Sequence, residues 1–77
     1  MSELAGAETV PEETRYADGG LKARGARLDG ALHGDWEFYR QDGSLMRSGS
    51  FSRGRQTGIW RTFRRDGTLV KATDFGV

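Results

Sequence analysis

The side chains that most often carry catalysis are few in this chain, and their spacing forms no catalytic group. His33 is the only histidine, cysteine is absent, and no carboxylate recurs around His33 at the spacing of metal ligands. Ser44, Ser48, Ser50 and Ser52 lie in one segment without a partner base, so a serine nucleophile has nothing to activate it. The sequence therefore predicts no enzyme, no metal site and no cofactor, and it assigns His33 to a loop or turn.

The glycines are also poor candidates for phosphate binding, although Gly-x-Gly spacing occurs in the chain. A phosphate-binding loop needs a following helix whose N-terminus faces the phosphate, and no helical pattern follows these glycines. We therefore assign the glycines to turns and to the repeat described below.

Aromatic and arginine side chains are better candidates for function, because such residues contribute most to protein interfaces. Trp36 and Trp60 have two compatible interpretations: they cover and stabilise a thin fold, or they anchor a partner. The chain has more large apolar side chains than one thin layer can hide, and exposed apolar surface usually marks an interaction site. The sequence thus predicts a protein partner, contacted by Trp36, Phe38, Tyr39, Arg47, Phe51, Trp60, Arg61 and Phe63.

Charge is unevenly distributed along the chain. Residues 1–13 contain four glutamates and no basic residue, whereas residues 14–77 hold all 12 Lys and Arg against seven Asp and Glu, a net charge of +5. We expect a disordered acidic segment over residues 1–13 and a folded domain over residues 14–77. The basic residues either keep an exposed sheet soluble or form a surface for an acidic partner.

Size and composition limit the fold. A chain of 77 residues has a marginal hydrophobic core, and without cysteine no disulfide can reinforce it. No apolar run approaches the roughly 18 residues of a membrane span, and the first ten residues lack the pattern of a signal peptide. We expect no membrane span and a cytoplasmic location, with stability supplied by a repeat or by a partner.

An internal repeat is the strongest signal in the sequence. A shift of 24 residues aligns the chain with itself without a gap, with eight identities in the first 24 positions compared. The units cover about residues 18–41, 42–65 and 66–77, and the third is truncated. The glycines that define the repeat are Gly19, Gly25, Gly30, Gly34, Gly43, Gly49, Gly54, Gly58 and Gly67.

Two kinds of turn divide each unit. An Asp-Gly pair, as at Asp42-Gly43, supplies the positive φ of a tight hairpin turn. A Gly-x-x-x-Gly element, as at residues 30–34, has the length of a four- or five-residue hairpin loop. The runs between these turns are too short for helices and predict an all-β, single-layer, twisted antiparallel meander of five to six strands. The expected strands are residues 14–17, 20–28, 34–40, 44–52, 58–64 and 68–75.

The register at the Asp-Gly turns has two solutions. A two-residue turn places Trp36 opposite Gly49, where an indole can lie over a residue without a side chain. This register puts Trp36, Phe38, Leu45 and Phe51 on one face, with Trp60, Leu69 and Phe75 in the next unit. A type I turn closed by a glycine bulge instead places Tyr39 opposite Leu45 and Phe63 opposite Leu69, with both tryptophans on the opposite face. The first solution is preferred because it explains a mid-strand glycine.

The segment Gly49-x-Phe51-x-x-Gly54-x-x-Thr57-Gly58-x-Trp60 and its copy over residues 25–36 resemble the MORN repeat. With the intervening aromatic-x-x-Asp-Gly-x-Leu, the chain is most similar to a bacterial MORN-repeat variant found in YwqK-like antitoxin components. The resemblance covers roughly residues 15–75. It implies stacked hairpins that bind a partner, in this family a toxin to be neutralised. Arg27 departs from the pattern, because the next unit has Phe51 at this position.

Three functions follow from these observations. The leading prediction is a non-catalytic protein-interaction module of the antitoxin or immunity type. The alternative is binding of anionic phospholipid or nucleic acid through the basic side chains, whose strong dependence on salt would distinguish it. The third is self-association of a structural repeat, since the first and last strands expose unpaired backbone groups.

Overall fold

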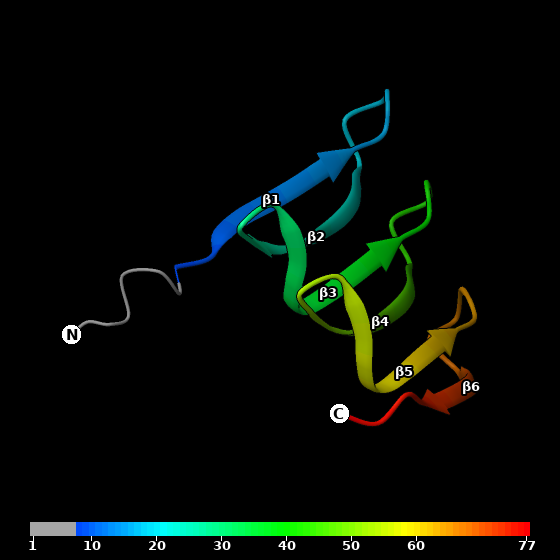
Figure 1. Cartoon of the computed structure of the whole chain (residues 1–77). Helices are drawn as coiled ribbons and strands as arrows, with labels where there is room; N and C mark the ends of the chain where they lie inside the picture. Colours follow the sequence, from blue (N-terminus) through cyan, green and yellow to red (C-terminus); the bar gives the residue numbers. More distant parts are fainter. Residues whose placement is uncertain (1–7) are drawn as a thin grey trace.

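The fold is a single open antiparallel sheet, seen in a computed structural model that describes residues 8–77 (Figure 1). Six strands follow one another in the order of the sequence, so each strand pairs with its neighbours along the chain. This arrangement confirms the predicted all-β, single-layer meander. The strands are β1 (Val10–Arg15), β2 (Leu21–Leu28), β3 (Ala31–Tyr39), β4 (Leu45–Ser52), β5 (Arg55–Phe63) and β6 (Leu69–Asp74).

The first strand begins earlier than the sequence predicted. Residues 10–13 were assigned to a disordered acidic segment, but they form most of β1 and pair with β2 from Val10 opposite Arg27 onward. An ion pair between Glu12 and Arg27 accompanies this pairing and gives one of the acidic residues a structural role. The rest of the predicted disordered segment, up to residue 7, lies outside the described residues.

The Asp-Gly turns are type I turns closed by a glycine bulge. The amide of Gly43 donates to the carbonyl of Arg40 over 2.9 Å, and the amide of Arg40 donates to the carbonyl of Ser44 over 2.9 Å. Gly43 has a φ of 91°, the left-handed conformation that this bulge requires. The carboxylate of Asp42 accepts the Ser44 amide at 2.8 Å. The same hydrogen bonds recur in the other two units. All three turns lie at the same ends of their hairpins, at the upper right of Figure 1.

The other hairpins are tighter than expected. The predicted loops over residues 30–34 and 54–58 are wrong, because strands resume at Ala31 and Arg55 after two-residue turns. Each turn has two consecutive residues at positive φ, such as Arg53 at 50° and Gly54 at 89°. This is the type I′ geometry, whose twist matches that of the flanking strands. Gly34 and Gly58 lie within strands instead, at positive φ.

The observed register combines the two solutions considered for the sequence. Next to the turn, Tyr39 lies opposite Leu45, as a type I turn with a bulge requires. Farther along, Phe38 lies opposite Arg47 and Trp36 opposite Gly49, as the two-residue turn predicted. A second bulge, after the glycine bulge of the turn, lies between these pairs. It shifts the pairing by one residue and so returns the strands to the register that a two-residue turn would give. The preferred turn type was therefore wrong, while its pairing of Trp36 with Gly49 was correct.

Each tryptophan lies over a glycine of the preceding strand, whereas the sequence predicted Trp36 over Gly49 on the following strand. A Cβ added at Gly25 would be 2.1 Å from the Trp36 ring, and one added at Gly49 would be 2.1 Å from the Trp60 ring. The indole Nε1 of Trp36 donates to the carbonyl of Ala26 at 3.0 Å, next to the covered glycine. Three residues of β3 stand opposite the single residue Gly25, and this bulge brings the Trp36 ring back over β2.

The repeat continues to both ends of the sheet with changed chemistry. Trp36 contacts Phe51 edge to face, and 24 residues later Trp60 contacts Phe75 in the same way. Twenty-four residues earlier, the equivalent positions are Glu12 and Arg27, which form the ion pair described above. Arg27 therefore departs from the aromatic pattern because its partner also does: a charged pair replaces an aromatic pair.

The buried core of the described residues is small and follows the two tryptophans. Ala23 and Leu28 are buried with Trp36 and Trp60, whose exposed fractions are 3% and 4%. Ring contacts join Trp36, Phe38, Phe51, Trp60 and Phe75 into a continuous layer. We call the side of the sheet that bears these five rings the aromatic face. Over residues 8–77, no helix is long and apolar enough to cross a membrane.

Candidate functional site

The opposite side of the sheet, here called the polar face, carries a row of side chains that crosses all six strands. Because side chains alternate between the faces of a strand, residues paired across the sheet share one face. The register brings them together in strand order: Glu13, Arg24, Glu37, Ser48, Arg61 and Ala72. Only Ser48 and Ala72 in this row have small uncharged side chains.

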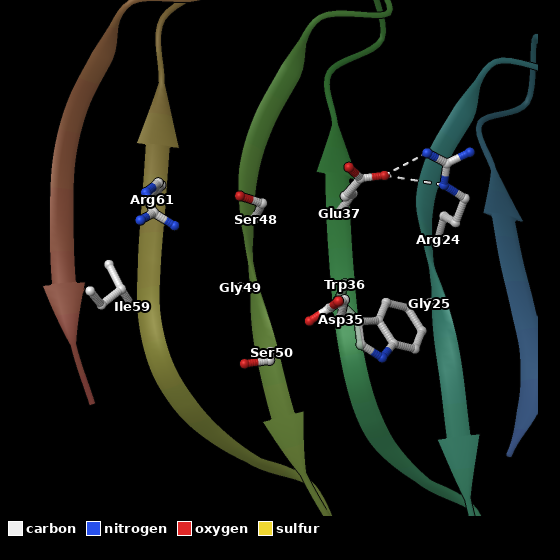
Figure 2. Close-up of a pocket in the computed structure, with 10 residues that line it drawn as sticks. All are labelled: Arg24, Gly25, Asp35, Trp36, Glu37, Ser48, Gly49, Ser50, Ile59 and Arg61. Carbon is white, nitrogen blue, oxygen red and sulfur yellow. Dashed lines mark hydrogen bonds and ion pairs between the residues drawn. The ribbon is translucent and has the colours of Figure 1, made fainter. Parts of the chain in front are cut away.

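A depression of about 680 Å³ lies on the polar face (Figure 2). Its middle is β4, where Ser48, Gly49 and Ser50 have short side chains or none. Larger side chains project from the strands on both sides, so the low middle strand leaves a hollow between them. The lining residues are Arg24, Gly25, Asp35, Trp36, Glu37, Ser48, Gly49, Ser50, Ile59 and Arg61.

One wall of the depression is a hydrogen-bonded group with no net charge. Arg24 donates to Glu37 Oε1 through Nη2 at 2.6 Å and through Nε at 3.1 Å, as Figure 2 shows. The hydroxyl of Tyr39 donates to the same oxygen at 2.8 Å. The bond from Arg24, followed by that from Tyr39, lowers the pKa of Glu37 below its ordinary value. Burial, and then the bond to Glu37, raises the pKa of Tyr39.

The other wall comes from β5 and has the opposite character. Arg61 occupies in its unit the position of Glu37, and Ile59 occupies the position of Asp35. Within residues 8–77 no carboxylate pairs with Arg61, and Ile59 is 46% exposed. The depression therefore offers the carboxylate of Asp35 beside the Arg24–Glu37 ion pair on one side, and a cation with an apolar side chain on β5.

The aromatic face holds a smaller hollow with a different chemistry. The guanidinium of Arg47 lies 5.4 Å from the centre of the Phe38 ring and 5.5 Å from that of Trp60, within the range of cation–π attraction. The hollow has a volume of about 110 Å³ and no carboxylate in its lining. The lining residues are Arg47, Gln56, Trp60, Thr62, Lys71, Thr73 and Phe75.

The residues predicted from the sequence to bind a partner do not form one site. Trp36 and Trp60 are in the core, in agreement with their structural interpretation, and a partner cannot reach most of either ring. Arg61 lines the polar depression, whereas Arg47 lies on the aromatic face. The rings of Phe38, Tyr39, Phe51 and Phe63 are half-buried.

Sequence reasoning missed most of the polar depression. The sequence feature that could have revealed it is the pairing of opposite charges across strands, as in Arg24 opposite Glu37. That pairing appears only when the bulge opposite Gly25 is counted, and the predicted loop over residues 30–34 and strand over residues 34–40 included no such bulge. The residues missed as site residues are Arg24, Asp35, Glu37, Ser48, Ser50 and Ile59.

The described residues contain no group of three or more His, Cys, Asp or Glu side chains placed to hold a metal ion. The Nδ1 atom of His33 accepts the backbone amide of Arg53 at 3.0 Å, which ties β3 to the turn of the next unit. His33 is thus a strand residue and not a loop residue, although its bond supports a turn. Ser50 donates to the carbonyl of Thr57, and Ser44 donates to Asp42.

Comparisons with protein-family models, with curated proteins and with solved structures found no match to this chain. Functional inference therefore rests on the two faces of the sheet and on the repeat.

Proposed function

We propose that this chain is a non-catalytic protein-interaction module that holds a segment of its partner in the depression on the polar face. The observation that carries the proposal is the pair of unlike walls on an open sheet. Asp35 lies beside the Arg24–Glu37 ion pair on one side, and Arg61 and Ile59 lie on β5 on the other. Charged and apolar groups arranged in this way give specificity for a complementary chain.

The dimensions of the depression support a polypeptide as the ligand. Its volume of about 680 Å³ falls within the ~300–1,000 Å³ of typical ligand sites. It is bordered by strands and lies on the surface of a single-layer sheet, where an extended segment can cross β3, β4 and β5. A basic side chain of the partner would then face Asp35, and an acidic one would face Arg61. An apolar side chain between them would cover Ile59.

The ion pair of Arg24 with Glu37 contributes rigidity to this site. Because the Tyr39 hydroxyl and the guanidinium both hold the same carboxylate oxygen, the wall is ordered before a partner arrives. Less conformational entropy is then lost on binding. The resemblance to the bacterial MORN-repeat variant further implies a toxin as the partner. In this proposal the module is a cytoplasmic antitoxin or immunity-type protein.

Affinity capture with two matched charge reversals tests the proposal. Arg61→Glu and Arg55→Glu both change the charge of an exposed β5 residue by the same amount, but only Arg61 lines the depression. From a lysate of its source, the unmodified chain should capture one stoichiometric protein. We expect Arg61→Glu to weaken its binding by about tenfold or more and Arg55→Glu to have little effect. Equal binding by both variants would exclude the depression as the contact.

A second candidate function is favoured by the hollow on the aromatic face. Arg47 and Lys71 both line it together with two threonine hydroxyl groups, and its lining contains no carboxylate. Such a surface suits an anionic group, as on a phospholipid or nucleic acid. Binding of this kind should fall steeply between low and moderate salt, because counterions are released, whereas capture in the polar depression should change less.

A further inference from the structure

Contact between successive repeat units depends on a tryptophan over a glycine, and the last unit lacks this glycine. Trp36 covers Gly25 and Trp60 covers Gly49, at positions where a Cβ would meet the indole at 2.1 Å. The equivalent residue of β6 is Thr73. Its side chain fills the space that the next indole would need, so another unit of the same kind cannot pack on β6.

The open edge of β6 nevertheless has unpaired hydrogen-bonding groups. The amide of Phe75 points toward β5, where it donates to the carbonyl of Gly58 at 2.9 Å. Since backbone groups alternate in direction along a strand, those of Ala72 and Asp74 point to the open side. Large apolar side chains are also exposed here: Leu69, Val70 and Phe75 are 50%, 52% and 47% exposed.

The opposite edge of the sheet is protected against pairing. In β1, Pro11 lacks a backbone amide, which removes a donor from this strand. Charged side chains surround it, with Glu12 paired to Arg27 and Glu13 paired to Arg15. Proline and charge are the usual means by which an edge strand avoids further pairing. The two edges therefore differ, and β6 is the one open to addition of a strand.

We infer that β6 pairs with β6 of a second copy of this chain, antiparallel and about a two-fold axis at Thr73. Residues opposite each other in such a pair must share a face, and Lys71, Thr73 and Phe75 all line the hollow on the aromatic face. With Thr73 on the axis, Lys71 lies opposite Phe75 of the second copy, which allows a cation–π contact. Ala72 and Asp74 then exchange their free backbone hydrogen bonds.

This pairing explains how Thr73 can end the repeat while large apolar side chains stay exposed at β6. Thr73 is small enough to lie next to Thr73 of the second copy on the axis. The two-fold symmetry uses the β6 edge of both chains, and since β1 is blocked the assembly closes at two chains. One pair of short edge strands buries less than the ~1,200 Å² of a standard interface, so the dimer should be weak. Its population should rise with concentration.

The test uses the 77-residue chain, which has no cysteine of its own. Facing residues at a non-hydrogen-bonded antiparallel pair have Cβ atoms about 4.5–5.5 Å apart, close to disulfide geometry. We expect Thr73→Cys to form a disulfide-linked dimer on mild oxidation at least about tenfold faster than Thr62→Cys. Thr62 is a half-buried residue on the same face, but it lies on β5, which is paired on both sides. Adding Ala72→Pro, which removes an edge donor without touching the β5 ladder, should slow this reaction.

Sedimentation of the unmodified chain over about a hundredfold range of concentration provides the second measurement. A reversible monomer–dimer equilibrium, lost in Ala72→Pro with an unchanged circular dichroism spectrum, is expected. A chain that stays monomeric, an open-ended polymer, or equal disulfide rates for Thr73→Cys and Thr62→Cys would each overturn the inference. No foreign protein takes part, so failure here is separate from failure of the proposed partner binding.

Discussion

Replacing Gly49 by alanine should lower the free energy of unfolding by about 2–4 kcal/mol. The new Cβ would be 2.1 Å from Cδ2 and 2.2 Å from Cε2 of Trp60, so the indole has to move. Overpacking of a core typically costs ~1–3 kcal/mol. Displacement of the ring also breaks the bond from Trp60 Nε1 to the carbonyl of Ser50, 3.1 Å long, for about a further 1 kcal/mol.

Urea denaturation followed by circular dichroism measures this loss, and tryptophan fluorescence reports whether the indole becomes exposed. Gly20→Ala is the matched control, because Gly20 also has an ordinary φ but its new Cβ would meet only the mobile carboxylate of Asp18, at 3.2 Å. We expect this control to change stability by less than about 1 kcal/mol. Gly25→Ala should reproduce the loss, since it disturbs the same contact with Trp36.

A double-mutant cycle separates the steric effect from any intrinsic cost of alanine in the strand. In a Trp60→Leu background the smaller side chain leaves room for a methyl group, so Gly49→Ala should cost less than about 1 kcal/mol. The same loss in both backgrounds, or a loss below about 0.5 kcal/mol in the unmodified chain, would refute the packing of indole on glycine as the basis of this fold.

Three further predictions concern turns and ion pairs. Arg53→Asn creates an Asn-Gly type I′ turn at a residue with a φ of 50°, and should raise the free energy of unfolding in urea by about 0.5–1 kcal/mol; a decrease would contradict the assigned turn. Arg24 lowers the pKa of Glu37, so the stabilisation from this carboxylate is complete above its ordinary value of about 4.5 and is lost as the pH falls through the lowered value. Acid titration of Glu37→Gln should therefore show a smaller loss of stability below that pH, and an unchanged acid profile would argue against the pair. Glu12→Ala should cost no more than about 1 kcal/mol at low salt and less at high salt, because Glu12 and Arg27 are both partly exposed; a cost that does not change with salt would show that packing, and not charge, holds this end of the sheet.

The sequence predicted the strands well because the turns that bound them depend on the conformational preferences of only a few neighbouring residues. An aspartate followed by glycine at 42–43 specifies a turn through the positive φ of Gly43 and through the Asp42 carboxylate that accepts the next amide. The 24-residue spacing of such pairs predicted five to six strands joined in the order of the sequence, and the sheet has six in that order. The same local rules misjudged residues 10–13, where acidic composition suggested disorder but pairing with β2 forms a strand.

The candidate site was harder to predict, because it depends on the bulges. A single inserted residue exchanges the faces of everything beyond it. The glycine bulge of the Asp-Gly turn and the bulge between Phe38 and Tyr39 offset one another, whereas the bulge opposite Gly25 places three residues opposite one and keeps the faces unchanged. Arg61 was selected from the sequence, yet its neighbours in the depression, Ile59 and Ser48, were not. Their shared face follows from the register.

By itself the sequence determined the all-β meander, its 24-residue unit and the pairing of Trp36 with the mid-strand glycine Gly49, since these depend on residue type and spacing. Only the tertiary structure decided which glycine each indole covers. The Trp36 ring crosses to Gly25 because a bulge in β3, which contains Gly34 at a φ of 79°, turns the ring back toward β2. Only the pairing of the two strands shows this bulge. The same register buries Trp36 in the core. It leaves Arg24, Glu37 and Arg61 together on the polar face.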